Sequence, residues 1–446
     1  MRHQGIVLLL VLSLSSLAGA QGPDNVAAFS TVTFEEAVRI ALSNGRDVHL
    51  AAQDVRIAAE GRTVASARWL PRLDAGADYT ALSESPGAIF QGVPVQTADK
   101  NIWRARVTAE QTIYDFGRTR SRVDQAGART DAAERLEGVT RERQALDVIS
   151  AFLDAKRADA LRKVAEESLA TAIDHLRLAR DRFEAGTVAR NDVLSADVQV
   201  ANAEVSLITA EVRMEISRSR LALRMGYRGD RSLAPSPGPY PVPTGGVPPL
   251  SESLQAAFGK RDELGAQGAA VREGEAAADT ARTEFAPTFF GQGGYSYETN
   301  DLNPHKSVFS ILLGGKVNLF SGFADEALLR QSRLAVDRRK ETLEKMRDEI
   351  ALEVKSAHLL VAEADKRKAV AETAVVNAEE NLRIQDERYR EGMAISTEVL
   401  DAQTLFTRAK VDRQNAVYDL AEARFRLLAA RGELLEFLAP RITAGR

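Results

Sequence analysis

The sequence contains one order of segments twice, and a pair of similar stretches marks the two copies most clearly. "RFEAGTVARNDVL" begins at Arg182 and returns as "RYREGMAISTEVL" at Arg388, an offset of 206 residues. "IYDFG" at Ile113 and "LFSGF" at Leu319 have the same offset. Similarity at a fixed distance indicates two structural repeats, which constrains the fold more than any single element does.

The upstream parts of the two repeats differ in length at one place. Pro71 corresponds to Pro287 at an offset of 216 residues, whereas Tyr114 corresponds to Phe320 at an offset of 206. The first repeat therefore has ten extra residues, which we place in the segment 83–100, with its two Pro and two Gly. A length change in a segment of this composition indicates an outward-facing loop.

Each repeat is expected to contain a helix, two strands, a very long helix and a return helix. The first repeat covers 34–231, with strands at about 72–82 and 101–114 and helices at 118–182 and 190–225. The second covers 250–438, with strands at about 288–298 and 306–320 and helices at 323–388 and 396–436. A linker rich in Pro and Gly, 232–249, separates the repeats, and 439–446 is a tail.

The long helices are predicted from heptad spacing. In the second repeat a 4-3 pattern is interrupted only by Lys368 and comprises Ile350, Val354, Ala357, Val361, Ala364, Ala371, Val375, Ala378 and Leu382. After the first tip the pattern continues in Leu194, Val198, Ala201, Val205, Ile208 and Val212. Two helical hairpins are expected, folded back at Gly186 and Gly392, because Gly accepts the left-handed conformation that ends helices. Heptad spacing and a helix-ending Gly occur in any helical hairpin, so these signals alone do not identify the function.

The shorter segments alternate with period two, which predicts strands with two different faces. Trp103, Ala105 and Val107 alternate with Arg104 and Arg106. A soluble amphipathic sheet has the same pattern, but the export signal described below and the position beyond very long helices favour a membrane sheet. Four strands cannot close a barrel, and open strand edges are not tolerated in lipid. We therefore expect pairing between copies; three copies give a twelve-stranded barrel, although strand count alone does not choose that number.

The N-terminus predicts an export signal over residues 1–20, followed by an N-terminal segment over 21–33. Arg2 precedes an apolar run, and Ala18-Gly19-Ala20 is typical of a cleavage site. The apolar run is short for the alternative, a transmembrane anchor. The chain has no cysteine, which excludes disulfides and a lipid-carrying N-terminal cysteine.

Composition narrows the function classes. The net charge is -4 without a basic block, so nucleic acid is not an expected partner. We expect no catalytic, metal or cofactor site, because P-loop and G-x-S-x-G motifs are missing. The histidines are scattered: His3, His49, His175, His305 and His358. An exported periplasmic coiled-coil scaffold without transport activity is the alternative function, but it leaves the paired alternating segments unexplained.

With this order of segments, the sequence resembles the TolC family of outer-membrane efflux channels. The resemblance rests on both hairpin tips, on Pro71 and Pro287 before the strands, and on Tyr114 and Phe320 after them. It covers residues 34 to about 438. It implies a mainly α fold with a membrane β-barrel: a homotrimer with a twelve-stranded barrel in outer-membrane lipid of a Gram-negative bacterium and a twelve-helix periplasmic tunnel. The linker and tail would form an equatorial belt.

The resemblance also implies a function and its residues. The protein would be the exit duct of a tripartite efflux or type I secretion system, with a periplasmic adaptor (membrane-fusion) protein and an inner-membrane pump of RND, ABC or MFS type. Its substrate stays open. A periplasmic gate would contain Asp192, Tyr389, Glu398 and Asp401, with Asp192 bonded to Tyr389; the family's gate arginine corresponds to Ala394. Adaptor contacts are expected at the tips, at Gly186, Thr187, Val188, Leu194, Gly392, Met393, Ala394 and Leu400.

Overall fold

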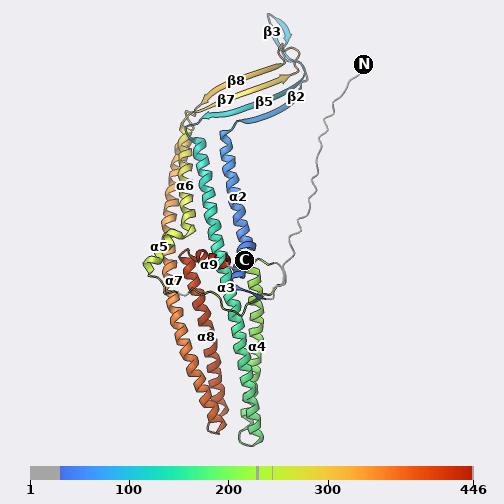
Figure 1. Ribbon diagram of the computed structural model, residues 1–446. Helices are drawn as coiled ribbons and strands as arrows, with labels where there is room; N and C mark the ends of the chain where they lie inside the picture. Colours follow the sequence, from blue (N-terminus) through green and yellow to red (C-terminus); the bar gives the residue numbers. More distant parts are fainter. Residues whose placement is uncertain (1–30, 228–230, 244, 444–446) are drawn as a thin grey trace, which may run out of the picture.

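The computed structural model describes residues 31–227, 231–243 and 245–443, which form an elongated layer of helices with a sheet at one end (Figure 1). The predicted signal peptide and residues 21–30 of the N-terminal segment lie outside the described residues. Within the described part, the two repeats lie side by side along the whole length of the molecule.

Two long helical hairpins form the half of the molecule that points away from the sheet. In the first, α3 (Arg118–Glu184) returns as α4 (Arg190–Arg224), and in the second, α7 (Ala324–Arg390) returns as α8 (Ser396–Ala430). Because α3 packs against both α4 and α8, the helices have the order α4, α3, α8, α7 in this half. The seam predicted on α7 faces α8, with Ile350, Val354, Ala357 and Val361 buried.

Shorter helices complete the layer in the half next to the sheet. They are α1 (Phe34–Asn44), α2 (Arg46–Ser66), α5 (Leu250–Lys260) and α6 (Asp262–Arg282). The order here is α2, α3, α6, α7. Each run ends in a short 3-10 turn, η1 (Ala67–Trp69) or η2 (Thr283–Phe285), and then meets Pro71 or Pro287. Because a residue before proline is forced into an extended conformation, the chain leaves the helix and enters a strand there.

Two helical expectations are corrected by the structure. The single helix expected at the start of each repeat is two helices, divided at Gly45 and at Arg261, which are both extended. The helix expected over 396–436 ends at Ala430, and α9 (Leu434–Thr443) follows, so much of the predicted tail is helical. Gly432 makes this turn with a φ of +70°, and a Cβ there would lie 3.1 Å from the Lys260 carbonyl carbon.

The sheet contains β2 (Arg72–Ala81), β5 (Asn101–Tyr114), β7 (Thr288–Glu298) and β8 (Ser307–Lys316), all antiparallel in the order β2-β5-β7-β8. The last strand stops at Lys316, earlier than the expected residue 320. The outer loop is not wholly irregular, since β3 (Gly87–Phe90) and β4 (Val93–Gln96) form a small hairpin there. Both outer edges of the sheet, β2 and β8, have one neighbour each in this chain.

The largest apolar core lies at the middle of the molecule. Phe34 packs against Phe152 and Phe425 with ring centroids 5.5 and 5.6 Å apart. The linker crosses this core: β6 (Ala234–Pro235) pairs in parallel with β1 (Thr31–Val32), and Lys156 Nζ donates to the Ser236 carbonyl at 2.8 Å. Arg424 on α8 donates to the Pro243 carbonyl at 2.9 Å, so the linker contacts both repeats at the equator (Figure 1).

Candidate functional site

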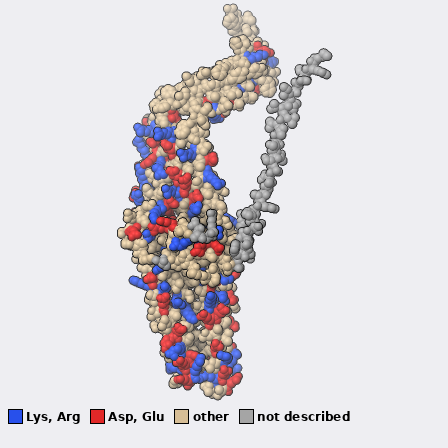
Figure 2. Space-filling model, in the orientation of Figure 1, with Lys and Arg blue, Asp and Glu red and all other residues tan. Residues whose placement is uncertain are grey.

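The sheet has one apolar and one charged face, as the period-two pattern predicts. The charged face carries cross-strand ion pairs, since Arg104 lies 3.8 Å from Asp78 and 3.4 Å from Glu298. Figure 2 shows that charged atoms cover the helices and are sparse over much of the sheet. The apolar face has no covering layer in the described chain and is exposed along its length, at Leu73, Tyr79, Trp103, Val107, Tyr295, Tyr297, Phe309, Ile311 and Leu313. Such a face fits lipid and not water.

Exposed aromatic rings lie at both ends of this face. Tyr79 and Trp103 lie at the far end with ring centroids 4.8 Å apart, and Tyr114 and Phe116 lie near the helices at 4.7 Å. Aromatic girdles of this kind mark the two interfaces of a bilayer. β5 has 14 residues and is about 46 Å long at about 3.3 Å per residue, enough to cross about 30 Å of hydrocarbon at a tilt of about 40°. Among the described helices, none combines the length and apolarity that a membrane crossing requires.

The duplicated motif encodes the same helix end twice. Gly186 has a φ of +72° and Gly392 a φ of +77°. In each tip the residue after the Gly donates its backbone N–H to the carbonyl five residues earlier, from Thr187 to Arg182 at 2.9 Å and from Met393 to Arg388 at 2.8 Å. This is the Schellman pattern, in which a left-handed Gly lets the chain satisfy the last helical carbonyls and turn back.

The two copies differ in what their arginine contacts. Arg182 reaches from the first tip to the second, where it donates to the carbonyl oxygens of Tyr389 and Arg390 at the end of α7. Its guanidinium also lies 4.9 Å from the centroid of the Tyr389 ring. Terminal helical carbonyls lack intrahelical partners and carry partial negative charge, so a cation stabilises them. Arg388 instead stays in its own hairpin, 3.7 Å from Glu398.

The implied bond between Asp192 and Tyr389 is not present. Tyr389 is fully buried, and its hydroxyl makes no hydrogen bond to Asp192. Burial raises the pKa of Tyr389, and the charge of Asp192 adds to this effect. The connection between the tips is made by Arg182, on the ring face and the carbonyls, and not by the tyrosine hydroxyl.

A polar seam joins the first hairpin to the second just above the tips. His175 on α3 lies 3.0 Å from the hydroxyl of Ser396, the first residue of α8, and its ring centroid is 5.2 Å from that of Tyr389. Further along, the hydroxyls of Ser168 and Thr407 are 3.2 Å apart. Sequence reasoning missed His175; the available signal was its position one heptad before Arg182, which places both on one face of α3.

The other expected gate and tip residues lie where the tips are open to solvent. Glu398 is in the first turn of α8 with a side chain 44% exposed, and Asp401 follows one turn later and is exposed. Met393 and Leu194 are 60% and 54% exposed, while Val188, Ala394 and Leu400 are half-buried. A cleft of about 690 Å³ separates the hairpins beside them. No described group of three or more His, Asp or Glu side chains is placed to hold a metal ion.

The edge helices carry apolar stripes that nothing in the described chain covers. The heptad pattern predicted on α4 faces outward, and all six of its members are exposed: Leu194, Val198, Ala201, Val205, Ile208 and Val212. Ile216 and Leu223 extend this stripe, whose larger side chains are 53–67% exposed. That prediction was wrong, because smaller residues such as Ala196 and Ala203 face α3 instead. On α7 a second set of apolar residues is 63–70% exposed: Leu334, Leu352, Leu359, Val370 and Val376.

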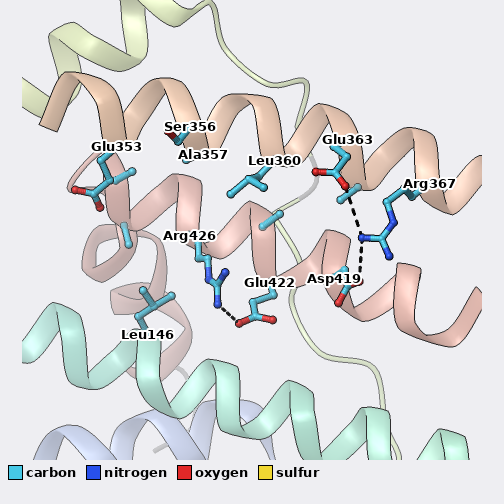
Figure 3. A pocket seen from close by; sticks show the side chains of 14 residues that line it. Leu146, Glu353, Ser356, Ala357, Leu360, Glu363, Arg367, Asp419, Glu422 and Arg426 are labelled. Carbon is cyan, nitrogen blue, oxygen red and sulfur yellow. Dashed lines mark hydrogen bonds and ion pairs between the residues drawn. The ribbon is translucent and has the colours of Figure 1, made fainter. Parts of the chain in front are cut away.

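A groove runs along the hairpin of α7 and α8. Its equatorial part has a volume of about 410 Å³ and charged walls, where Arg367 lies 3.5 Å from Asp419 and Arg426 lies 2.6 Å from Glu422 (Figure 3). A second part, of about 940 Å³, continues toward the tips and shares Glu363 and Arg367 with the first. Alanines line much of this part: Ala371, Ala374, Ala378, Ala409 and Ala416.

Comparison with known proteins agrees with this geometry. The sequence profile of the outer membrane efflux protein family matches residues 37–227 and 253–433, one stretch in each repeat. Nodulation protein T of Rhizobium leguminosarum bv. viciae is 24% identical over 437 residues, which is 94% of this chain and 85% of that protein. Outer membrane efflux protein BepC of Brucella suis biovar 1 (strain 1330) is 21% identical, covering 95% and 90%. With Nodulation protein T of R. leguminosarum bv. trifolii, 26% identical, the chain aligns over only 41% of that protein.

Solved structures share the fold. The Campylobacter jejuni CmeC outer membrane channel has a TM-score of 0.77 at 17% identity, with 92% of this chain and 88% of that chain covered. The open state of the Neisseria gonorrhoeae MtrE outer membrane channel has a TM-score of 0.75 at 19% identity, covering 90% and 89%. The family profile matches both repeats, and this match establishes to which family the chain belongs. The chain therefore belongs to the outer membrane efflux protein family, and it is a protein of the outer membrane.

Proposed function

We propose that this protein is the exit duct of a tripartite efflux or secretion system, which conducts substrates passively from the periplasm to the exterior. The observation that carries the proposal is the direct connection of a two-faced sheet to a layer of very long helices. α3 has 67 residues and extends about 100 Å. A sheet that crosses the outer membrane and helices that reach this far below it suit a continuous passage through the periplasm.

The duct is a homotrimer in this proposal, and the edges of the single chain support it. β2 and β8 each have a free edge, which lipid does not tolerate. In the half away from the sheet, α4 and α7 form the two opposite edges of the helical layer, and both carry exposed apolar residues. When one edge of each copy packs against the other edge of the next, the contacts are head-to-tail and close a ring. Three copies supply twelve strands, a number within the range of known outer-membrane barrels.

The periplasmic mouth forms the gate, with Asp192, Tyr389, Glu398 and Asp401 at its rim. Glu398 and Asp401 are three residues apart in the first turns of α8 and share a face. Symmetry places three copies of each around one axis, where crowded carboxylates attract cations. Arg182 holds the second tip against the first through the end of α7. Release of this contact separates the hairpins and widens the mouth.

The partners in this proposal are a periplasmic adaptor and an inner-membrane pump of the RND, ABC or MFS type. The Ala-lined groove along α7 and α8 and the exposed tip residue Met393 support docking of a helical adaptor, because small side chains admit another helix closely. The exported substrate and the pump type are left open. A photocrosslinking residue in place of Met393, followed by purification, identifies the adaptor.

Pore formation in a lipid bilayer tests the proposal against the scaffold alternative. Detergent-extracted protein is expected to form trimers and to produce stable conductance steps in a planar bilayer. A coiled-coil scaffold would instead be recovered in the soluble periplasmic fraction as a species without conductance. Recovery of a folded, soluble protein that forms no pores refutes the exit-duct function.

A further inference from the structure

We propose that protonation of His175 weakens the contact between the two hairpins, so that acid in the periplasm opens the mouth. The inference rests on the exit-duct function and adds a regulation to the same gate. Its starting point is two buried polar atoms that lack hydrogen-bond partners within the described chain: His175 Nδ1 and Gln403 Oε1.

The position of His175 makes its charge state matter to the seam. The side chain is 94% buried against α8 and α7, since its residue keeps only 6% of its accessible surface. The neutral ring uses Nε2 for the contact with Ser396 and leaves Nδ1 without a hydrogen-bond partner. A protonated ring has an N–H group at both nitrogens. Nδ1–H would then be a buried donor without an acceptor, and the ring itself would carry a positive charge in a buried site.

The charged groups around His175 do not compensate for this burial. Asp386 on α7 is engaged by Arg390 at 2.8 Å, and Asp174 on α3 by Arg177 at 3.3 Å. Asp192 on α4 acts on His175 through its charge without a hydrogen bond to the ring. The cleft beside the ring also presents Asp181 from α3, Glu379 and Arg383 from α7, and the uncharged Gln403, Val399 and Phe406 from α8.

The sign of the effect follows from burial. Burial lowers the pKa of His175 below its usual 6.5, and the charges of Asp386 and Asp192 only partly oppose this. When the hairpins separate, the ring meets water and its pKa returns toward 6.5. The closed seam is therefore fully stable above that pH and loses stability as the pH falls toward the lowered pKa. Three copies per trimer add their effects.

Single-channel recording with acidified periplasmic-side buffer tests the inference. The wild-type open fraction is expected to rise about tenfold between about pH 7.5 and about pH 5. His175→Gln keeps a side chain able to bond to Ser396 but cannot be charged, so its open fraction is expected to stay constant. The matched control is His358→Gln, because His358 is 2.8 Å from the Ser253 hydroxyl and its pKa is also lowered by burial, yet it lies away from the tips. This control is expected to keep the wild-type response.

A reversible disulfide between the two hairpins gives a second test. The chain has no cysteine, and the hydroxyls of Ser168 and Thr407 are 3.2 Å apart across the seam. Ser168→Cys with Thr407→Cys is expected to abolish the acid response when oxidised and to restore it on reduction. If the His175→Gln channel still opens in acid, or if the wild-type channel does not, the proposed role of His175 is wrong. Failure to form pores at any pH overturns the exit-duct function instead.

Discussion

Placing acids in the outward stripe of α4 is expected to abolish the trimer. Val205 and Ile208 are 63% and 60% exposed in the single chain. Full burial of such a side chain contributes about 1.5–3 kcal/mol, so covering the exposed part is worth about 1–2 kcal/mol per residue. Six such side chains in a closed trimer contribute about 6–12 kcal/mol. Val205→Glu with Ile208→Glu removes this contribution and adds the desolvation of six carboxylates.

The assay is the mass of the detergent-extracted protein by light scattering, with circular dichroism to confirm that the helices remain. The double variant is expected to be a helical monomer. The matched control is Asn202→Glu with Ser206→Glu, which adds the same charge at two exposed positions of α4 outside the stripe. A double variant that stays trimeric and dissociates at the wild-type temperature refutes the assignment of this stripe to the contact between copies.

The remaining predictions concern the gate and the equator. Arg182→Ala is expected to raise the open fraction of the channel, whereas Arg388→Ala, at the equivalent place in the second tip, should change it little; equal effects would show that the link across the tips is unimportant. Glu398→Ala with Asp401→Ala is expected to lower cation selectivity and relieve block by multivalent cations, with the trimer intact; unchanged block places the selectivity elsewhere. Burial raises the pKa of Glu142 to about 7, so its contribution to stability is present in acid and declines as the pH rises through about 7. Glu142→Gln is therefore expected to raise thermal stability at about pH 8.5 by about 1–2 kcal/mol per chain, after allowance for solvent screening, and to leave it unchanged near pH 4.

Local chemistry explains which parts of the fold were predictable from the sequence. Gly186 and Gly392 end helices because their positions require a positive φ, and that requirement is readable in the repeated motif. Pro71 and Pro287 fix the change from helix to strand through the residue before each of them. The breaks at Gly45 and Arg261 were not predicted, although Asn44-Gly45 is a dipeptide that favours a turn.

Contacts between distant segments explain most of the rest of what was missed. The contact of His175 with Ser396 joins residues that are far apart in sequence. The sequence does not show whether the side of α3 that carries His175 faces α8 or α4. Arg182 and Arg388 have equivalent sequence contexts, yet Arg182 crosses to the other tip and Arg388 does not. Sequence similarity within the motif cannot distinguish them, because the difference lies in which neighbour stands beside each hairpin.

The α4 stripe shows most clearly how a correct pattern leads to a wrong contact. A heptad pattern indicates that a face requires a partner, but it does not identify the partner. On α4 the larger residues, such as Val205 and Ile208, face outward, while Ala196 and Ala203 let α3 approach closely. In a single layer of helices every member needs two neighbours, and in the proposed trimer an edge helix finds one of them in another copy. Both edge helices, α4 and α7, have one apolar side buried within the chain and further apolar residues exposed. This feature argues for a closed ring of copies rather than an isolated hairpin.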